Sequence, residues 1–291
     1  MPSFLTAEPS AAICDSQQTA RLNVLFWNVN GEIDLSLLAK MVDELDVSLL
    51  CLAESTIDNA ELLNRISARG DRHFKNLRLM TPKLTVITRS DIAGDERYSD
   101  INGRLSVLGL KVAKQEFLFA AVHLQSMNNT DEKDRFTEAC IVADQIRAVE
   151  EEHSNNRTIL CGDLNMNPFS DGVVAAKAFH AIADRRIVQR GARVVQNREY
   201  PFFYNPMWNF LGDETDGPPG TLYYRHSGHV SYEWNMFDQV LIRPQCLGFY
   251  RGVSVLTESC GISLAKKSGR PNRKKYSDHF PLLINFEVPN A

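Results

Sequence analysis

A carboxylate and an imidazole stand side by side near the end of the chain. Asp278 and His279 come just before the apolar run 282–286, which is typical of a β-strand. Neighbouring residues of a strand point to opposite faces, so both side chains can serve one site only where the chain turns into that strand. Metal-assisted phosphate chemistry needs a carboxylate that binds the metal cation and, beside it, a hydrogen-bond donor that binds the phosphate anion.

Three more polar residues stand at the ends of apolar, strand-like runs. Asn28, Glu54 and His123 each end such a run. A carboxylate at the end of a buried strand must be solvated or ligated, because burying it bare is costly. An imidazole in that position can donate to a phosphate oxygen or act as a general acid. The ordinary alternatives are a turn asparagine, an exposed acid and a core histidine.

Two further acids have the same relation to apolar runs. Asp163 and Asn165 follow the run 158–161 and are two residues apart, so in extended chain they share a face. Gly162 before them allows backbone or ligand to come close. Asp238 begins the run 238–242. A common glycine–aspartate turn is the alternative for the first pair.

The elements that must position these residues alternate between helical and strand patterns. The periodicity predicts helices at 34–45, 60–69, 131–153 and 171–183. It predicts a long ordered loop at 199–220 and strands at 22–27, 48–52, 85–88, 104–111, 116–123, 157–161, 222–224, 236–242, 252–256 and 282–288. This order favours one α/β domain built on two packed sheets.

Composition limits the class of protein. The 291 residues are 44% hydrophobic and 23% charged, as in ordinary globular proteins, and the net charge of −4 means that any polyanion site must be a local patch. We expect residues 1–20 to form a loose arm and residues 21–289 a single domain. No run approaches 18 apolar residues, and the six cysteines have no CxxC spacing. These features favour a cytoplasmic protein with reduced thiols and no membrane association, and they identify no protein partner.

In chain order, the polar residues at the strand ends resemble the endonuclease/exonuclease/phosphatase superfamily, the family of deoxyribonuclease I, exonuclease III and the neutral sphingomyelinases. The resemblance spans roughly residues 22–288, and its most specific pieces are GDLN at 162–165 and SDH at 277–279. It implies an α/β fold, a four-layer sandwich of two central mixed β-sheets flanked by helices, with the active site at one end.

The resemblance also implies a metal site. Glu54 matches the principal Mg²⁺ ligand of the family, with Asn28 and Asp278 nearby in the metal shell; Mn²⁺ is the alternative ion. This set is consistent with the preference of Mg²⁺ for few carboxylates together with waters and substrate phosphate.

Five residues match the catalytic positions of the family. Asp163 would orient or deprotonate the attacking water, and Asn165 would hold a phosphate oxygen. His279 would face the scissile phosphate while Asp238 bonds its other ring nitrogen, and His123 matches the second histidine of the family. A carboxylate that bonds a histidine fixes the tautomer of the ring and favours its cationic form. A cationic histidine suits the negative charge that develops on the phosphorane.

Two departures from the family pattern bear on the substrate. Ala53 stands where many relatives have glutamine before the metal-binding glutamate. The segment HLQS at 123–126 stands where the abasic-endonuclease branch typically carries a tyrosine-containing segment. The second departure places the sequence closer to the deoxyribonuclease I-like side than to the abasic endonucleases.

Basic residues are the candidates for substrate contact. Segment 266–275 holds six basic residues and no acid and leads directly into the SDH motif, so Arg273, Lys274 and Lys275 are predicted to contact substrate. Arg104 and Arg135 are further candidates for phosphate contact. The alternative for the segment is a solvated loop whose charges only aid solubility.

Together these features predict a Mg²⁺-dependent phosphodiesterase, most simply a nuclease that hydrolyses nucleic acid by metal-assisted water attack on phosphorus. A phosphoesterase acting on a small molecule or a lipid phosphate would use the same catalytic set. A catalytically silent binding module on this fold is the second alternative.

Overall fold

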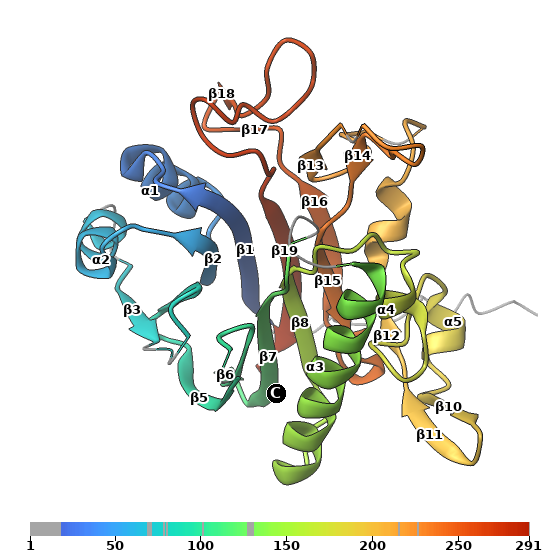
Figure 1. The fold of residues 1–291 in the computed structure, drawn as a ribbon. Helices are drawn as coiled ribbons and strands as arrows, with labels where there is room; N and C mark the ends of the chain where they lie inside the picture. The colour runs from blue at the N-terminus through green and yellow to red at the C-terminus, as the bar shows by residue number, and fades with distance from the viewer. Residues whose placement is uncertain are drawn as a thin grey trace, which may run out of the picture.

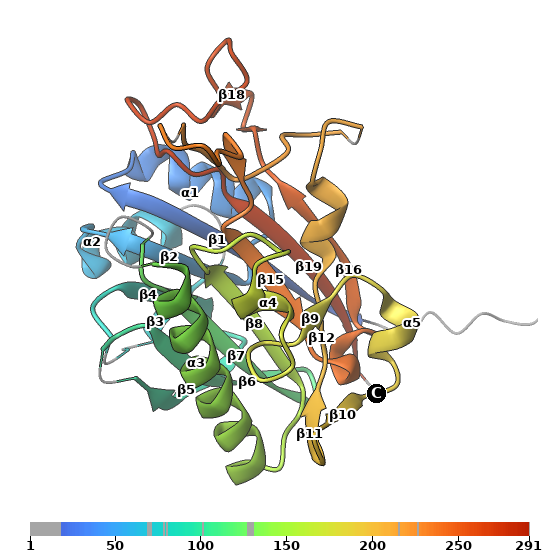
Figure 2. The same ribbon diagram turned by 45° about the vertical axis from the view of Figure 1, so that its right-hand side comes forward.

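Two mixed β-sheets pack face to face and carry helices on their outer sides (Figures 1 and 2). The computed structural model describes residues 19–68, 72–77, 79, 81–100, 102–126, 131–214, 216–225 and 227–290. The predicted class, an α/β sandwich with two central mixed sheets, is confirmed. Within the described residues, no helix is both long and apolar enough to cross a membrane.

One sheet has six strands and contains both the first and the last strand of the described chain. Its order is β16 (Tyr250–Val255), β19 (Leu282–Pro289), β1 (Thr19–Gly31), β2 (Leu49–Ser55), β4 (Leu84–Arg89) and β3 (Phe74–Leu77). β1 pairs with β19 in antiparallel fashion and with β2 in parallel fashion.

The other sheet has seven strands. Its order is β5 (Ala93–Ser99), β6 (Leu105–Val112), β7 (Gln115–His123), β8 (Thr158–Asp163), β15 (Asp238–Ile242), β12 (Phe203–Tyr204) and β9 (Ala181–Ile182). Three two-stranded ribbons complete the strands: β10 (Ala192–Val195) with β11 (Arg198–Pro201), β13 (Leu222–Tyr223) with β14 (Trp234–Asn235), and β17 (Glu258–Ser259) with β18 (Ile262–Ser263).

Helices form the outer layers of the sandwich. α1 (Leu35–Glu44) and α2 (Asn59–Ser67) lie beside the six-stranded sheet, and α3 (Glu132–Glu152) and α4 (Asp171–Val174) lie beside the seven-stranded sheet (Figure 1). α5 (Arg185–Val188) and the 3₁₀ turns Pro206–Phe210 and Pro244–Cys246 are short. Aspartate caps start the three long helices: Asp34, Asp58 and Asp131 each accept backbone N–H bonds from the first turn.

The core divides between the layers of the sandwich. Phe26, Phe117 and Ile284 belong to the larger cluster, which includes residues of both sheets and of α1 and α2. A second cluster joins α3 to the outer face of the seven-stranded sheet, where Ala143 and Ile146 pack with strand residues such as Leu160. Both faces of the central strands are therefore buried, which explains their nearly continuous apolar runs.

A buried ion pair ties α3 to the residue that follows β15. Nε and Nη2 of Arg243 donate to the two carboxylate oxygens of Glu150 at 2.8 and 2.9 Å, and both residues are less than 5% exposed. Thr158 Oγ1 also donates to Glu150, and Arg243 Nη1 donates to the carbonyl oxygens of Pro201 and Phe202. The pair is thus bidentate and its remaining polar atoms are largely satisfied.

Two predicted elements are wrong. The helix expected at 171–183 ends at Val174, because Ala175 is extended with ψ 140° and Ala181–Ile182 pairs instead with β12. The segment 199–220, expected to be a loop, contains the end of β11, the sheet strand β12 and a 3₁₀ turn. In both places sheet pairing overrides the local pattern.

The predicted arm lies mostly outside the described residues. Residues 1–18 are not described, whereas Thr19 and Ala20 already belong to β1, where they pair with Pro289 and Val288. Cys51, Cys140, Cys161 and Cys246 are buried free thiols.

Candidate active site

Three polar side chains lie in register across neighbouring strands of the seven-stranded sheet. His123 at the end of β7 pairs with Asp163 at the end of β8, and Asp163 pairs with Asp238 at the start of β15. β8 is parallel to β7 and antiparallel to β15. The ends of β7 and β8 and the start of β15 therefore meet at one edge of the sheet. Gly162 permits this closeness, since a Cβ there would lie 1.9 Å from the carbonyl oxygen of Val122.

The six-stranded sheet contributes the facing residues. Asn28 on β1 pairs with Ala53 on β2, so Glu54 is the next residue beyond that pair. Glu54 has a left-handed backbone with φ 52°. This conformation is strained for a residue other than glycine and is found preferentially at functional sites. Its N–H donates to the carbonyl oxygen of Lys83, the residue before β4.

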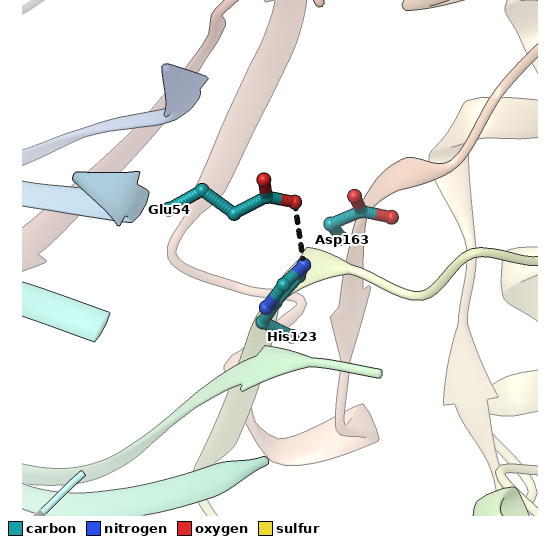
Figure 3. Close-up of side chains that lie close together, drawn as sticks. All are labelled: Glu54, His123 and Asp163. Atoms are coloured by element: carbon teal, nitrogen blue, oxygen red, sulfur yellow. Dashed lines mark ion pairs between the residues drawn. The ribbon is translucent and has the colours of Figure 1, made fainter. Parts of the chain in front are cut away.

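Glu54, His123 and Asp163 form a compact cluster between the two sheets (Figure 3). One possible ligand atom from each lies within 4.8 Å of the others. Nε2 of His123 lies 3.0 Å from Oε1 of Glu54. Nδ2 of Asn28 donates to Oε1 of Glu54 at 3.1 Å and to Oδ2 of Asp163 at 3.0 Å, so a single amide bridges the two carboxylates.

The donor set of this cluster fits a divalent cation. Two carboxylates converge closely enough to share one donor, and Mg²⁺ prefers a small number of carboxylate oxygens with its remaining positions left to water and phosphate. The hydrogen bond from His123 outweighs burial and lowers the pKa of Glu54 to about 2, so this carboxylate is ionised. Glu54 and Asp163 are the residues that would hold the ion.

Of the three residues predicted to lie in the metal shell, Asn28 and Glu54 are in direct contact, whereas Asp278 makes other contacts. Asn28 turns its NH₂ group toward the carboxylates, while its Oδ1 accepts from the N–H of Asn30. Asp278 belongs to neither group of metal-capable side chains in the described part of the chain. Instead, its Oδ1 accepts from Asn30 at 2.8 Å and its Oδ2 lies 3.6 Å from Nε of Arg273.

Asp238, His279 and Asp163 form a second buried group adjoining the first. Oδ2 of Asp238 lies 2.7 Å from Nδ1 of His279, and Asp238 is fully buried. Burial alone would lower the pKa of His279, but the charge and hydrogen bond of Asp238, with Asp163 and Asp278 nearby, raise this pKa to about 10. His279 is therefore a cation whose Nδ1 is held by a carboxylate.

The pKa of Asp163 is shifted in the opposite direction from that of Glu54. Its burial and the negative charge of Asp238 raise its pKa above the ordinary aspartate value. Its Oδ1 accepts from the backbone N–H of Asn165 at 2.8 Å. Asn165 is itself left-handed, with φ 49°, and donates from Nδ2 to the carbonyl oxygen of Leu124. The two residues of the GDLN turn thus hold one another beside the cluster.

Buried hydrogen bonds fix the SDH turn against β1. Ser277 Oγ donates to the carbonyl oxygen of Asn28 at 2.6 Å and accepts from the N–H of His279 at 3.0 Å. Nε1 of Trp27 donates to the carbonyl oxygen of His279 at 3.0 Å. Ser277 and Trp27 were missed as positioning residues, and only the place of Ser277 within the SDH motif could have indicated one of them.

The predicted substrate contacts fall in three places. Arg104 lines a recess that it shares with Glu54, His123 and Lys83, and it pairs with Glu138 at 3.4 Å. Arg135 lines a separate cavity next to Asn165. Lys83 was not predicted, because its place beside Glu54 depends on the pairing of β2 with β4.

The basic segment forms an ordered loop at the top of Figure 1 and Figure 2. Backbone bonds and an Ala265–Pro271 bridge close it, and Leu264 and Tyr276 anchor its ends in the interior. All six basic side chains are exposed. Of the predicted contacts, Arg273 pairs with Asp278, next to His279, and Lys275 lies over the ring of Tyr276, while Lys274 is exposed.

Comparison with known proteins agrees with this geometry. The family model described as Endonuclease/Exonuclease/phosphatase family matches residues 25–279. The chain belongs to the endonuclease/exonuclease/phosphatase family. Members of this family are generally hydrolases of phosphodiester bonds and typically use divalent metals. A search of curated protein sequences gave no match.

Solved structures share the fold of this family at low sequence identity. A Bacteroides thetaiotaomicron endonuclease/exonuclease/phosphatase family protein has a TM-score of 0.58 at 16% identity, covering 94% of this chain and 100% of its own. D. rerio TDP2 complexed with single strand DNA product has a TM-score of 0.54 at 16% identity, covering 91% and 98%. The endonuclease domain of TRAS1, a telomere-specific non-LTR retrotransposon, has a TM-score of 0.53 at 12% identity, covering 93% and 100%.

Proposed function

We propose that this chain is a divalent-metal-dependent nuclease that hydrolyses phosphodiester bonds of nucleic acid by attack of water on phosphorus. The observation that carries the proposal is the cluster of Glu54, His123 and Asp163, which adjoins the Asp238–His279 pair. The residues that would hold the ion, the buried carboxylate of Asp163 and the cationic ring of His279 then lie within one small volume. A silent binding module has no need of such an arrangement.

A divalent ion bound here would neutralise charge on the phosphate and lower the pKa of the attacking water. Mg²⁺ is the expected ion and Mn²⁺ the alternative. Glu54 and Asp163 would hold it, and Asn28 orients both carboxylates through its NH₂ group. His123 keeps Glu54 in place from the opposite sheet.

Asp163 is the group best suited to orient the water and accept its proton. It is 1% exposed and belongs to both groups of side chains, so it lies next to Glu54 on one side and to His279 on the other. Asn165, beside it, has an amide that can donate to a phosphate oxygen. Cationic His279 faces the same volume and stabilises the charge that develops on the phosphorane oxygens, while Asp238 keeps its tautomer fixed.

The basic loop favours nucleic acid over a small phosphate ester. Six exposed cations next to the SDH turn form a local positive patch on a chain whose net charge is −4. A short ester bound at Glu54 and His279 does not need such a surface, whereas a polymer with a phosphate at every residue does. The DNA product bound by TDP2 and the endonuclease role of the TRAS1 domain, on the same fold, support this choice.

The test is hydrolysis by the purified protein of plasmid DNA, single-stranded DNA, RNA, phospholipid and a small phosphodiester, with Mg²⁺ or with chelator. We expect metal-dependent cleavage of nucleic acid. Asp163→Asn and His279→Ala should each lower kcat by about 10²-fold or more, with little change in binding. Val194→Ala, on the β10–β11 ribbon, is the control. Cleavage of phospholipid or the small ester alone would replace the nuclease with a phosphoesterase.

A further inference from the structure

A cavity of about 450 Å³ opens next to Asn165. Seven large hydrophobic side chains are exposed among the described residues, and four of them line this one cavity: Phe169, Tyr224, Val230 and Tyr232, which are 38%, 40%, 68% and 59% exposed. Apolar exposure is therefore concentrated beside the catalytic residues. Such concentration on an otherwise polar surface marks a binding site.

The rings in this cavity are held in place. Phe169 and Tyr232 meet edge to face, with ring centroids 5.1 Å apart and an interplanar angle of 63°. This contact fixes the orientation of both rings and leaves ring surface open to the cavity. Because their positions are set before a ligand arrives, the rings lose little conformational entropy on binding.

The floor of the cavity is continuous with the catalytic residues. Asn167 Nδ2 donates to Oδ1 of Asn235 at 3.0 Å, and Asn167 Oδ1 accepts from the N–H of Met236 at 2.8 Å. These buried bonds join the turn that carries Asp163 and Asn165 to the segment that leads into Asp238. A group in the cavity is therefore at a fixed place relative to Asn165 and to the phosphate that we propose it contacts.

Charge on the rim argues against a phosphate in this cavity. Asp131, Glu132 and Asp171 line it, and Arg135 is the one cation among the described lining residues. Asp131 already caps the start of α3 by accepting from the N–H of Asp134, so the positive end of that helix is neutralised. The occupant should be planar, neutral and attached close to the scissile phosphate.

We propose that the cavity binds the nucleobase of the nucleotide next to the scissile phosphate. This base unstacks from the neighbouring bases of the strand and stacks against the rings of Phe169 and Tyr232. The proposal rests on the nuclease function proposed above. Every base has a stacking face, so this contact is tolerant of sequence and favours unpaired strands, whose bases are free to turn outward.

The substrate for the test is a single-stranded oligonucleotide with one ordinary phosphodiester among methylphosphonate linkages, made in deoxyribose and ribose versions. The scissile bond is then known. A tetrahydrofuran residue replaces the nucleotide on one side of it and then on the other. We expect removal of the base on one side to lower kcat/KM about 5- to 150-fold, the range of base–aromatic stacking, and removal on the other side to have little effect.

Substitutions assign that difference to the cavity. Phe169→Ala and Tyr232→Ala should each lower kcat/KM on the complete oligonucleotide about tenfold and lose the difference between complete and abasic substrates. Tyr232→Phe, which keeps the ring, should retain the difference between complete and abasic substrates. Val194→Ala, which removes a comparably exposed side chain elsewhere, is the control and should behave as wild type. Equal loss on complete and abasic substrates, or no loss, would overturn the proposal.

A binding measurement separates this proposal from the nuclease proposal. In Asp163→Asn, aminopurine placed next to the phosphodiester should lose fluorescence on binding, because it stacks on a ring, and Phe169→Ala should restore that fluorescence. If wild type cleaves no oligonucleotide but this quenching is seen, the nuclease proposal fails and the base site stands. Absence of quenching in a complex that does form would overturn the base site.

Discussion

Nε2 of His123, from the seven-stranded sheet, lies 3.0 Å from Oε1 of Glu54, from the six-stranded sheet. The candidate ion site therefore depends on residues that the chain contributes from two separate layers.

Glu54→Gln should raise the Mg²⁺ concentration needed for half-maximal activity, because it removes one of the two carboxylate charges that would hold the ion. The side chain of Glu54 is 42% exposed, so the fold should be retained. Titration of activity with Mg²⁺ measures the effect, and Glu116→Gln, an exposed acid near the opposite end of β7, is the control. Full activity of wild type in excess chelator would contradict the metal site.

Asp238→Asn should change the pH dependence of kcat/KM. His279 has its pKa raised to about 10, so its cation is present at neutral pH and is lost as the pH rises through that value. Without the carboxylate of Asp238, burial lowers the pKa of His279, and the loss of activity should begin at a lower pH. Rate profiles between about pH 6 and pH 10 measure the shift. A variant that is uniformly slower, with an unmoved profile, would show that Asp238 does not act through this proton.

Glu150→Gln should destabilise the fold by about 3–5 kcal/mol, because it leaves Arg243 charged, buried and short of its partner. The double variant Glu150→Leu with Arg243→Met should cost far less than the sum of the single changes. Glu287→Gln, in the exposed pair with Arg251, should cost at most about 1 kcal/mol. Urea denaturation gives the free energies of unfolding, and equal costs for the two single variants would refute the distinction.

Replacing Arg273, Lys274 and Lys275 by Ala should flatten the salt dependence of nucleic-acid binding. Each phosphate contact contributes a slope of about −0.7 to −0.9 in log affinity against log salt. Hydrolysis of a small phosphodiester should be almost unchanged. Replacing Arg186, Arg190 and Arg193, three exposed arginines near α5, is the matched control. Equal loss on both substrates would mean that the loop only supports the SDH turn.

Much of the site could be predicted because polar residues that end buried runs are conspicuous in sequence. Asn28, Glu54, His123 and Asp163 all stood out in this way, and the structure brings them together. Their individual contacts could not be predicted in the same manner. Asn30, for example, has a left-handed backbone and donates from its amide to Asp278, a contact that no spacing along the chain indicates.

Several strands were not predicted, and the shortest of them have little local pattern. β9 and β12 have two residues each, too few for an alternation to be visible, and they form because β12 pairs with β15 and β9 pairs with β12. Lys83 was missed for a related reason. Its position beside Glu54 follows from the pairing of β2 with β4, and sheet order is a property of the assembled fold.

The pairing of β1 with β19 has a consequence for synthesis. β19 lies inside the six-stranded sheet, between β16 and β1, and matches β1 over eight residue pairs from Thr19–Pro289 to Phe26–Leu282. Until the ribosome has released this last strand, β1 carries an open edge of unpaired N–H and C=O groups, which is a template for aggregation. The nascent chain also lacks His279 until nearly the same moment, so the complete candidate site and a closed sheet should be acquired together, once β19 has left the ribosome.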